Sequence, residues 1–132
     1  CDWSSDVCSS DLAAETAPIE PEQALVAAGV EVMRVSLGSD GHLDLREALT
    51  LLGTRGINRV FSEGGPRIGE KLALEGLADE VIVSTSPKTL GQPGIVAVRP
   101  GLAAQLADPD LYALAEAGQI GQDRFEHFTR RG

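Results

Sequence analysis

Apolar and polar positions alternate along the chain with two different periods, one typical of helices and one typical of strands. The stretch LDLREALTLLGTRG has its apolar residues at a helical spacing, which predicts one buried face made of Leu45, Ala48, Leu49 and Leu52. Asp44 is the expected N-cap, and Glu47 completes a capping box three residues later. Gly53 or Gly56 is expected to end this helix.

The other predicted elements rest on shorter patterns bounded by glycine or proline. In chain order they are a helix over 21–28 stopped by Gly29, strands over 30–35 and 58–62, a helix from Pro66 to Gly76, strands over 79–84 and 94–98, and a hairpin around 118–123. In the second long helix, Ile68 and Leu72 are expected to face inward. Residues 13–21 show no pattern and are interpreted as a loop.

Strands that alternate with helices indicate an α/β fold with right-handed crossovers. The sequence therefore predicts a mostly parallel sheet flanked by helices, with the C-terminal hairpin as an antiparallel edge. An exposed sheet edge is compatible with pairing between two copies, so a homodimer is one hypothesis, which the sequence alone does not establish.

The first twelve residues, CDWSSDVCSSDL, differ from everything that follows. They contain the only Trp and both Cys residues, and they show neither a helical nor a strand period. A zinc site needs about four closely spaced ligands, which Cys1 and Cys8 do not supply. Read back into codons, the stretch resembles a common short-read sequencing adapter. We interpret residues 1–12 as an artefactual prefix, residues 13–28 as a loop and short helix, and residues 29–132 as part of one domain.

Composition narrows the classes of function. The chain has a formal net charge of −9 and only 4% aromatic residues, which disfavours a nucleic-acid-binding protein with a basic stripe. No apolar run approaches the length that spans a membrane. Outside the prefix there is no Cys, and no signal peptide is visible, which is typical of a cytoplasmic protein. No metal site is predicted.

The segment SEGGPRIGEK, residues 62–71, carries the most chemical information. It reads as the end of a strand, a glycine turn and the start of a helix. Gly64 and Gly65 lack a Cβ, so a ligand can approach the backbone closely. The N–H groups and the dipole at a helix start favour phosphate. Glu63 would direct a carboxylate toward the same crevice.

The turn and its neighbours also have simpler interpretations. A Gly-Gly-Pro turn is also an ordinary way to begin a helix, and Glu63 taken alone is an ordinary solvated carboxylate. Asp79 and Glu80 are interpreted as capping or edge charges rather than catalytic groups. His42 and His127 are interpreted as surface residues. Lys88 is placed in a loop at the carboxyl end of a strand, where a ligand contact is possible but not favoured.

Taken together, the motifs resemble a known family. EGGP, the amphipathic helix after it, GLADEVIVSTSP, the glycine loop LGQPG and the preceding LDLREALTLLGTRGINRVFSEGG are similar to the C-terminal reductase domain of the bifunctional riboflavin-biosynthesis deaminase/reductase. The resemblance covers about residues 29–130, with Asp123 near the position of a late acidic turn. No part of the sequence resembles the earlier half of that domain, or the zinc signature of the deaminase domain.

The resemblance implies a dihydrofolate-reductase-like fold and NADPH as the cofactor. The implied reaction is the reduction of 5-amino-6-(5-phosphoribosylamino)uracil, a small pyrimidine ribosyl-phosphate, whose ribosyl group becomes ribityl. Glu63 corresponds to the family's substrate-binding glutamate. The implied cofactor-binding residues are Gly64, Gly65, Pro66, Arg67, Ile68, Gly69, Glu70 and Lys71. The catalytic residues are not identified, and they are expected upstream of this fragment.

Two further hypotheses remain open at this point. The glycine turn could belong to a non-catalytic phosphate- or nucleotide-binding α/β module, which would bind simple phosphates without hydride transfer. The chain could also be purely structural, in which case no ligand would affect its melting.

Overall fold

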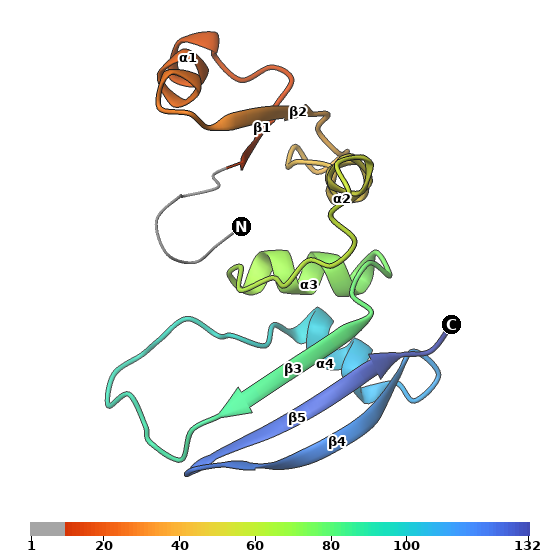
Figure 1. Cartoon of the computed structure of the whole chain (residues 1–132). Helices are drawn as coiled ribbons and strands as arrows, with labels where there is room; N and C mark the ends of the chain where they lie inside the picture. The colour runs from red at the N-terminus through yellow and green to blue at the C-terminus, as the bar shows by residue number, and fades with distance from the viewer. Residues whose placement is uncertain (1–9) are drawn as a thin grey trace. The chain divides into compact units, whose positions relative to one another are not determined.

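The computed structural model describes residues 10–132, which divide into two compact units (Figure 1). The N-terminal unit ends at Val60, and the C-terminal unit begins at Phe61. The elements in chain order are β1 (Ser10–Ala14), α1 (Ile19–Ala27), β2 (Glu31–Val35), α2 (Leu45–Thr54), α3 (Pro66–Leu74), β3 (Glu80–Thr85), α4 (Pro100–Ala107), β4 (Tyr112–Ile120) and β5 (Asp123–Arg130). None of the helices in this range is long and apolar enough to cross a membrane.

The N-terminal unit contains a parallel strand pair joined through a helix. β1 pairs with β2 over its full length, from Ser10 opposite Glu31 to Ala14 opposite Val35, and α1 contacts β2. The predicted helix and strand are confirmed here within two residues. β1 was not predicted, because Ser-Asp-Leu-Ala-Ala has no strand period and becomes a strand only through its partner. The predicted loop therefore begins too early, because Ala13 and Ala14 belong to β1, as do the last three residues of the predicted prefix, Ser10–Leu12. The rest of that prefix lies outside the described residues.

Alternate residues of β2 and one face of α2 form the core of the N-terminal unit. Met33, Val35 and Ala48 are at most 3% exposed. The Asp44 carboxylate accepts a hydrogen bond from the Glu47 N–H at 2.9 Å, which confirms the predicted N-cap of α2. The reciprocal half of the capping box is absent, because the Glu47 carboxylate binds the backbone N–H and the hydroxyl of Ser36 instead.

The C-terminal unit contains a separate three-stranded sheet in the order β3-β5-β4, in which both strand pairs are antiparallel (Figure 1). The predicted C-terminal hairpin is confirmed, and Gly121 lies in its turn with a φ of 64°. The prediction of a mostly parallel sheet is not confirmed, since the strand predicted over 79–84 forms β3 and runs antiparallel to β5. β3 and β4 are the edges of this sheet, and the homodimer expected from an open edge stays a prediction.

Two predicted strands do not form. Residues 58–62 and 94–98 pair with no strand among the described residues, and their apolar side chains are exposed, including Phe61 at 78% and Ile95 at 86%. A strand is stable only where its N–H and C=O groups find a partner, and a local apolar pattern does not supply one. Ile68 is 44% exposed rather than inward-facing, because no strand 58–62 lies behind α3; Leu72 is half-buried.

Tyr112, at the start of β4, is a buried anchor of the C-terminal unit. It is 3% exposed, and its hydroxyl donates a hydrogen bond to the Ala78 carbonyl at 2.8 Å. Burial raises the pKa of this phenol above its usual value of 10.0, and Asp79 adds to the increase, while Arg130 opposes it. The folded protein therefore keeps its phenolic proton at a pH where the unfolded chain releases it.

Tyr112→Phe is expected to change the alkaline stability profile. The wild-type free energy of unfolding should fall as the pH rises from the unfolded pKa near 10 through the higher folded pKa. Near neutral pH the variant should be less stable by about 1 kcal/mol, because the Ala78 carbonyl loses its donor. Urea unfolding of both proteins from pH 7 to pH 11 measures the difference. Parallel pH profiles for the two proteins would contradict the assignment.

Candidate functional site

The predicted glycine turn immediately precedes α3. Gly65 is the N-cap, with φ −61° and ψ 170°, and Pro66 is the first helical residue. The Gly65 carbonyl accepts hydrogen bonds from the N–H groups of Ile68 at 3.0 Å and Gly69 at 3.3 Å. The N–H of Arg67 has no hydrogen-bond partner within residues 10–132. The first turn of α3 therefore offers one unpaired backbone donor close to the turn.

The two glycines of the turn have different surroundings. A Cβ on Gly64 would lie 3.1 Å from Ile68 Cδ1, so this glycine allows the turn to fold back against α3. A Cβ on Gly65 would meet no heavy atom within 4 Å. Gly65 therefore faces open space, where the backbone is accessible to a ligand.

Charged side chains of both signs flank Gly65. Glu63 and Arg67 are exposed, and neither forms an ion pair or a side-chain hydrogen bond within the part of the chain that the structure describes. A carboxylate and a guanidinium that are not already paired can each bind a ligand without first breaking an internal contact. The arrangement suits a ligand that carries both phosphate and hydroxyl groups.

Glu70 occupies a different environment, although it lies in the same predicted cofactor segment. Its carboxylate accepts hydrogen bonds from Arg99 Nε at 2.5 Å and from the Gly101 N–H at 2.8 Å. The hydrogen bond from Arg99 lowers the pKa of Glu70 and outweighs the opposing effect of burial; the Gly101 N–H adds to the decrease. The Glu70 side chain is 16% exposed and joins α3 to α4 instead of facing the turn.

The structure places the remaining sequence-predicted residues in surface or cross-strand contacts. Lys71 Nζ lies 3.7 Å from Glu75 Oε1, one helical turn further along α3. Asp79 pairs with Arg130 at 2.9 Å. Glu80 Oε2 lies 3.0 Å from His127 Nε2, and the His127 side chain is 24% exposed, so it is half-buried rather than solvent-facing as predicted. These contacts agree with the interpretation of Asp79 and Glu80 as edge charges.

His42 and Lys88 have only short-range contacts. His42 Nδ1 lies 3.1 Å from the Asp40 carbonyl, and the Lys88 backbone N–H donates to Ser86 Oγ at 3.4 Å. Among residues 10–132 no three His, Cys, Asp or Glu side chains are grouped so that they could hold a metal ion.

Sequence reasoning missed Arg99, Gly101 and the helix α4 that follows them. The available signal was Pro100, which occupies the first turn of α4 in the same way as Pro66 occupies the first turn of α3. No local sequence pattern indicated that Arg99 pairs with Glu70, because the two residues are 29 positions apart.

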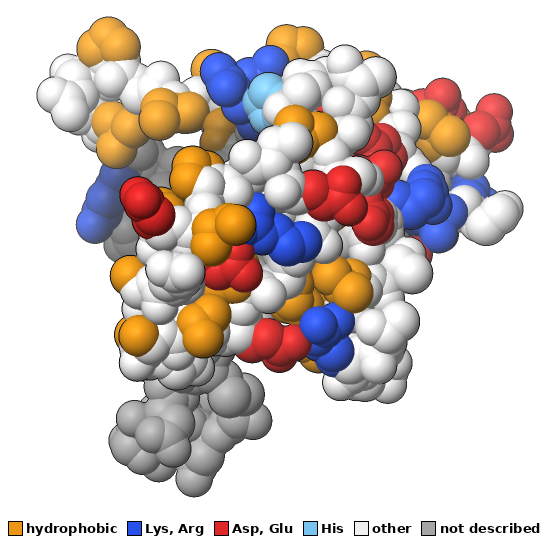
Figure 2. Space-filling model, turned by 90° about the horizontal axis from the view of Figure 1, so that it is seen from above, with side chains coloured by type: hydrophobic (Ala, Val, Ile, Leu, Met, Phe, Trp, Pro, Cys, Tyr) orange, Lys and Arg blue, Asp and Glu red, His pale blue; other side chains and the backbone are white. Residues whose placement is uncertain are grey.

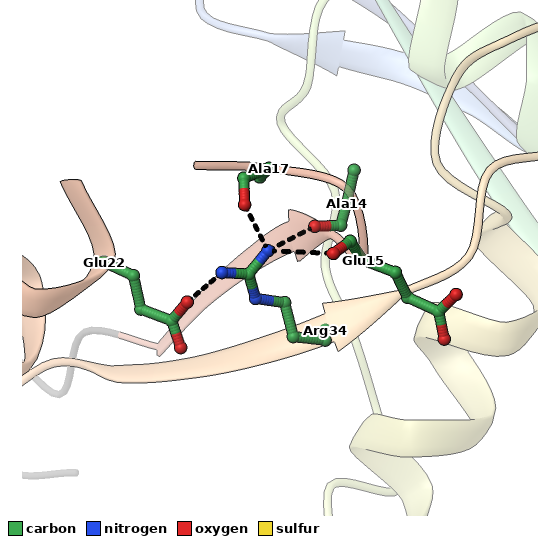
Figure 3. A network of polar contacts seen from close by, with 5 residues as sticks. All are labelled: Ala14, Glu15, Ala17, Glu22 and Arg34. Atoms are coloured by element: carbon green, nitrogen blue, oxygen red, sulfur yellow. Dashed lines mark hydrogen bonds and ion pairs between the residues drawn. The ribbon is translucent and has the colours of Figure 1, made fainter. Parts of the chain in front are cut away.

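Arg34 is the centre of the polar contacts in the N-terminal unit (Figure 3). One guanidinium nitrogen donates to the carbonyls of Ala14 at 2.7 Å, Glu15 at 3.3 Å and Ala17 at 2.8 Å, and the other pairs with Glu22. These bonds hold the segment after β1 against β2 and α1. Since its donors are used within its own chain, we assign Arg34 a structural role.

Charged and apolar side chains are interspersed on the face that Figure 2 displays. Lys and Arg side chains lie there among Asp and Glu side chains, and hydrophobic side chains are scattered between them. The glycine turn combines an accessible backbone with the unpaired charges of Glu63 and Arg67.

Comparison with known proteins identifies the family. The model of the RibD C-terminal domain matches residues 6–120. The chain belongs to the RibD C-terminal domain family. It is 38% identical over 90 residues to the riboflavin biosynthesis protein RibD of Escherichia coli K12, and 34% identical over 88 residues to the protein of the same name from Haemophilus influenzae. Each alignment covers 67% of this chain and 24% of the relative, so the aligned region spans about a quarter of the relatives' length.

The family match covers the candidate site and part of the predicted prefix. It includes the glycine turn, Glu70, Arg99 and β4, and it ends before β5. It begins at residue 6, inside the stretch interpreted as an artefactual prefix. The RibD C-terminal domain family thus accounts for the elements that carry the candidate site.

Proposed function

We propose that this chain is the cofactor-binding part of a reductase of riboflavin biosynthesis. Its reaction is the NADPH-dependent reduction of 5-amino-6-(5-phosphoribosylamino)uracil, in which the ribosyl group becomes ribityl. The observation that carries the proposal is the open backbone at Gly65 between the unpaired side chains of Glu63 and Arg67. Membership of the RibD C-terminal domain family and the names of the two relatives support the pathway.

The turn has the donors that a dinucleotide phosphate needs. In the proposed cofactor segment, Gly64–Lys71, we assign direct phosphate contacts to the Gly65 backbone, the Arg67 N–H and the Arg67 guanidinium. An unpaired N–H at a helix start favours an anion, and the guanidinium adds a charge-assisted bond. Lys71 is paired with Glu75, and Glu70 with Arg99, so both support the helix rather than contact phosphate. Bound NADPH would supply the hydride.

Glu63 has a role on the substrate side of the turn. Its carboxylate is exposed and unpaired, and it directly precedes the two glycines. A carboxylate accepts hydrogen bonds from sugar hydroxyls, so Glu63 can hold the ribosyl group while the cofactor occupies the turn. Holding the two reactants together removes much of the entropic barrier to reaction.

The proposal predicts which ligand each residue affects. The 132-residue chain is expected to bind NADPH saturably and in preference to NADH, as measured by fluorescence titration. Glu63→Gln should leave the NADPH dissociation constant unchanged within about twofold, because this carboxylate contacts no phosphate, and it should weaken substrate binding about tenfold through a lost charge-assisted hydrogen bond. Glu116→Gln is the matched control for the change of charge. Loss of NADPH binding in Glu63→Gln would show that the assigned role is wrong.

The same experiment distinguishes the non-catalytic phosphate-binding module. That alternative is also supported by the open Gly65, since any phosphate can approach such a backbone. It predicts that pyrophosphate binds as tightly as NADPH and that NADPH is not preferred over NADH. A folded chain with this behaviour would overturn the reductase proposal.

A further inference from the structure

Helices α3 and α4 contact each other, and Glu70 joins them through a two-point contact. One carboxylate oxygen accepts from Arg99 Nε at 2.5 Å, and the other accepts from the Gly101 N–H at 2.8 Å. Arg99 is the N-cap of α4, and its side chain makes no capping hydrogen bond. Glu70 therefore supplies, from another helix, the acceptor that a serine or aspartate N-cap would normally provide.

Gly101 makes this contact sterically feasible. A Cβ at this position would lie 2.6 Å from Glu70 Oε1, which is shorter than any stable contact between a carbon and an oxygen atom. With a Cβ at this position, the Glu70 carboxylate would have to shift away from the place where it accepts from the Gly101 N–H. A glycine at residue 101 thus leaves room for the carboxylate of Glu70.

The contact connects the glycine turn to a long irregular segment. Residues 86–99 run from the end of β3 to the start of α4 without regular structure, and Leu90 and Ile95 within them are 79% and 86% exposed. Figure 1 shows this segment leaving the end of β3 in a wide loop and returning to α4, which contacts α3. Glu70 lies on α3 itself, five residues after Gly65, so it fixes the last residue of the segment to the helix that carries the turn.

We propose that Glu70 is a positioning residue for the cofactor site. By holding Arg99 and the start of α4 against α3, it fixes the segment 86–99 next to the glycine turn, where the segment contributes to the surface that receives the dinucleotide. Glu70 acts through Arg99 and Gly101 and does not contact the cofactor. The inference rests on the proposed function, because it concerns the binding of NADPH at that turn.

The test combines NADPH affinity with hydrogen exchange of the full chain. Glu70→Ala is expected to weaken NADPH binding roughly tenfold, because displaced binding groups lose much of their contribution. Without ligand, the same variant should exchange the amides of residues 86–107 faster than the wild type. Glu70→Gln keeps an acceptor for the Gly101 N–H and should fall between the two. Gly101→Ala should resemble Glu70→Ala, since its Cβ displaces the carboxylate.

Glu116→Ala is the matched control, because Glu116 is exposed on β4 in the same unit and forms no ion pair within the described residues. It should change neither readout. Arg99→Gln distinguishes a positioning role of the Glu70–Arg99 contact from a direct effect of these charges on NADPH. A positioning role predicts that Arg99→Gln and Glu70→Gln both weaken NADPH binding. A pure charge effect predicts opposite signs, with tighter binding in Glu70→Gln.

The other possible outcomes separate this inference from the proposed function. Unchanged NADPH affinity in Glu70→Ala, together with faster exchange, would show that the contact is structural only and would overturn the inference while the proposed function stands. A wild-type chain that does not bind NADPH would overturn the proposed function, and the inference with it. If Glu70→Ala does not fold, Glu70→Gln and Arg99→Gln decide the question through the sign of their effects.

Discussion

Gly65→Ala is expected to weaken NADPH binding roughly hundredfold while leaving the fold intact. Gly65 has a φ of −61°, which alanine adopts readily, and its Cβ would meet no protein atom within 4 Å. The added methyl group would instead occupy the space through which a phosphate approaches the backbone, and displacement by about 1 Å can cost two orders of magnitude. Fluorescence titration with NADPH measures the loss of affinity.

Stability provides the internal control for this variant. Alanine is a poorer N-cap than glycine by a few tenths of a kcal/mol, but it also reduces the conformational entropy of the unfolded chain, so the free energy of unfolding should stay within about 0.5 kcal/mol. Gly53→Ala, one residue before the end of α2, is the matched substitution at another glycine where a Cβ would meet no heavy atom within 4 Å. It should raise stability by less than the roughly 0.5–1 kcal/mol typical of a mid-helix glycine and leave NADPH binding unchanged. Equal affinity in Gly65→Ala and the wild type would rule out phosphate binding at this turn.

The elements that the sequence predicted correctly are those specified by local residues. α2 has its cap at Asp44, its apolar face at a helical spacing and a glycine with φ 81° at residue 56, all within a short stretch. The C-terminal hairpin is likewise specified locally, because Gly121 adopts the positive φ that its turn requires. In both cases the interactions that decide the structure join residues close together in sequence.

The sheet could not be predicted in the same way, because strand pairing is non-local. Residues 58–62 have a strand-like composition, yet no partner strand lies beside them in the part of the chain that the structure describes. β1 shows the reverse situation: its composition is unremarkable, and pairing with β2 makes it a strand. The direction of β3 depends on β5, which lies about forty residues later in the chain.

The candidate site also contains both features that local residues specify and contacts between residues far apart in the sequence. The glycine turn and the start of α3 were predicted from ten consecutive residues, and the structure has a helix that begins at Pro66. The family resemblance placed Glu70 among eight cofactor-binding residues, and that assignment stays a prediction; its carboxylate accepts hydrogen bonds from Arg99 and Gly101, which no local pattern indicated. Arg34 likewise gave no signal, because three of its four partners are backbone carbonyls, which any residue type supplies.

Met33→Ala is expected to destabilise the N-terminal unit by about 2–5 kcal/mol, the usual range for truncating a buried methionine. Met33 is 2% exposed, and its β2 neighbour two residues on, Val35, is fully buried. The core of this unit includes few other residues that are as deeply buried, so the surrounding side chains can close only part of the cavity. Because small domains are stable by only about 5–15 kcal/mol, a loss of this size leaves a substantial unfolded population in mild urea.

Hydrogen exchange resolved by peptide would place this effect in the chain, with faster exchange expected in β1, α1 and β2. Met33→Leu is the control, because a swap that conserves volume typically costs less than about 1.5 kcal/mol. The comparison separates the loss of buried volume from the loss of the thioether. Equal urea midpoints for Met33→Ala and Met33→Leu would contradict the assignment, because they would mean that the β2 face carrying Met33 and Val35 is not the packed interior of the unit.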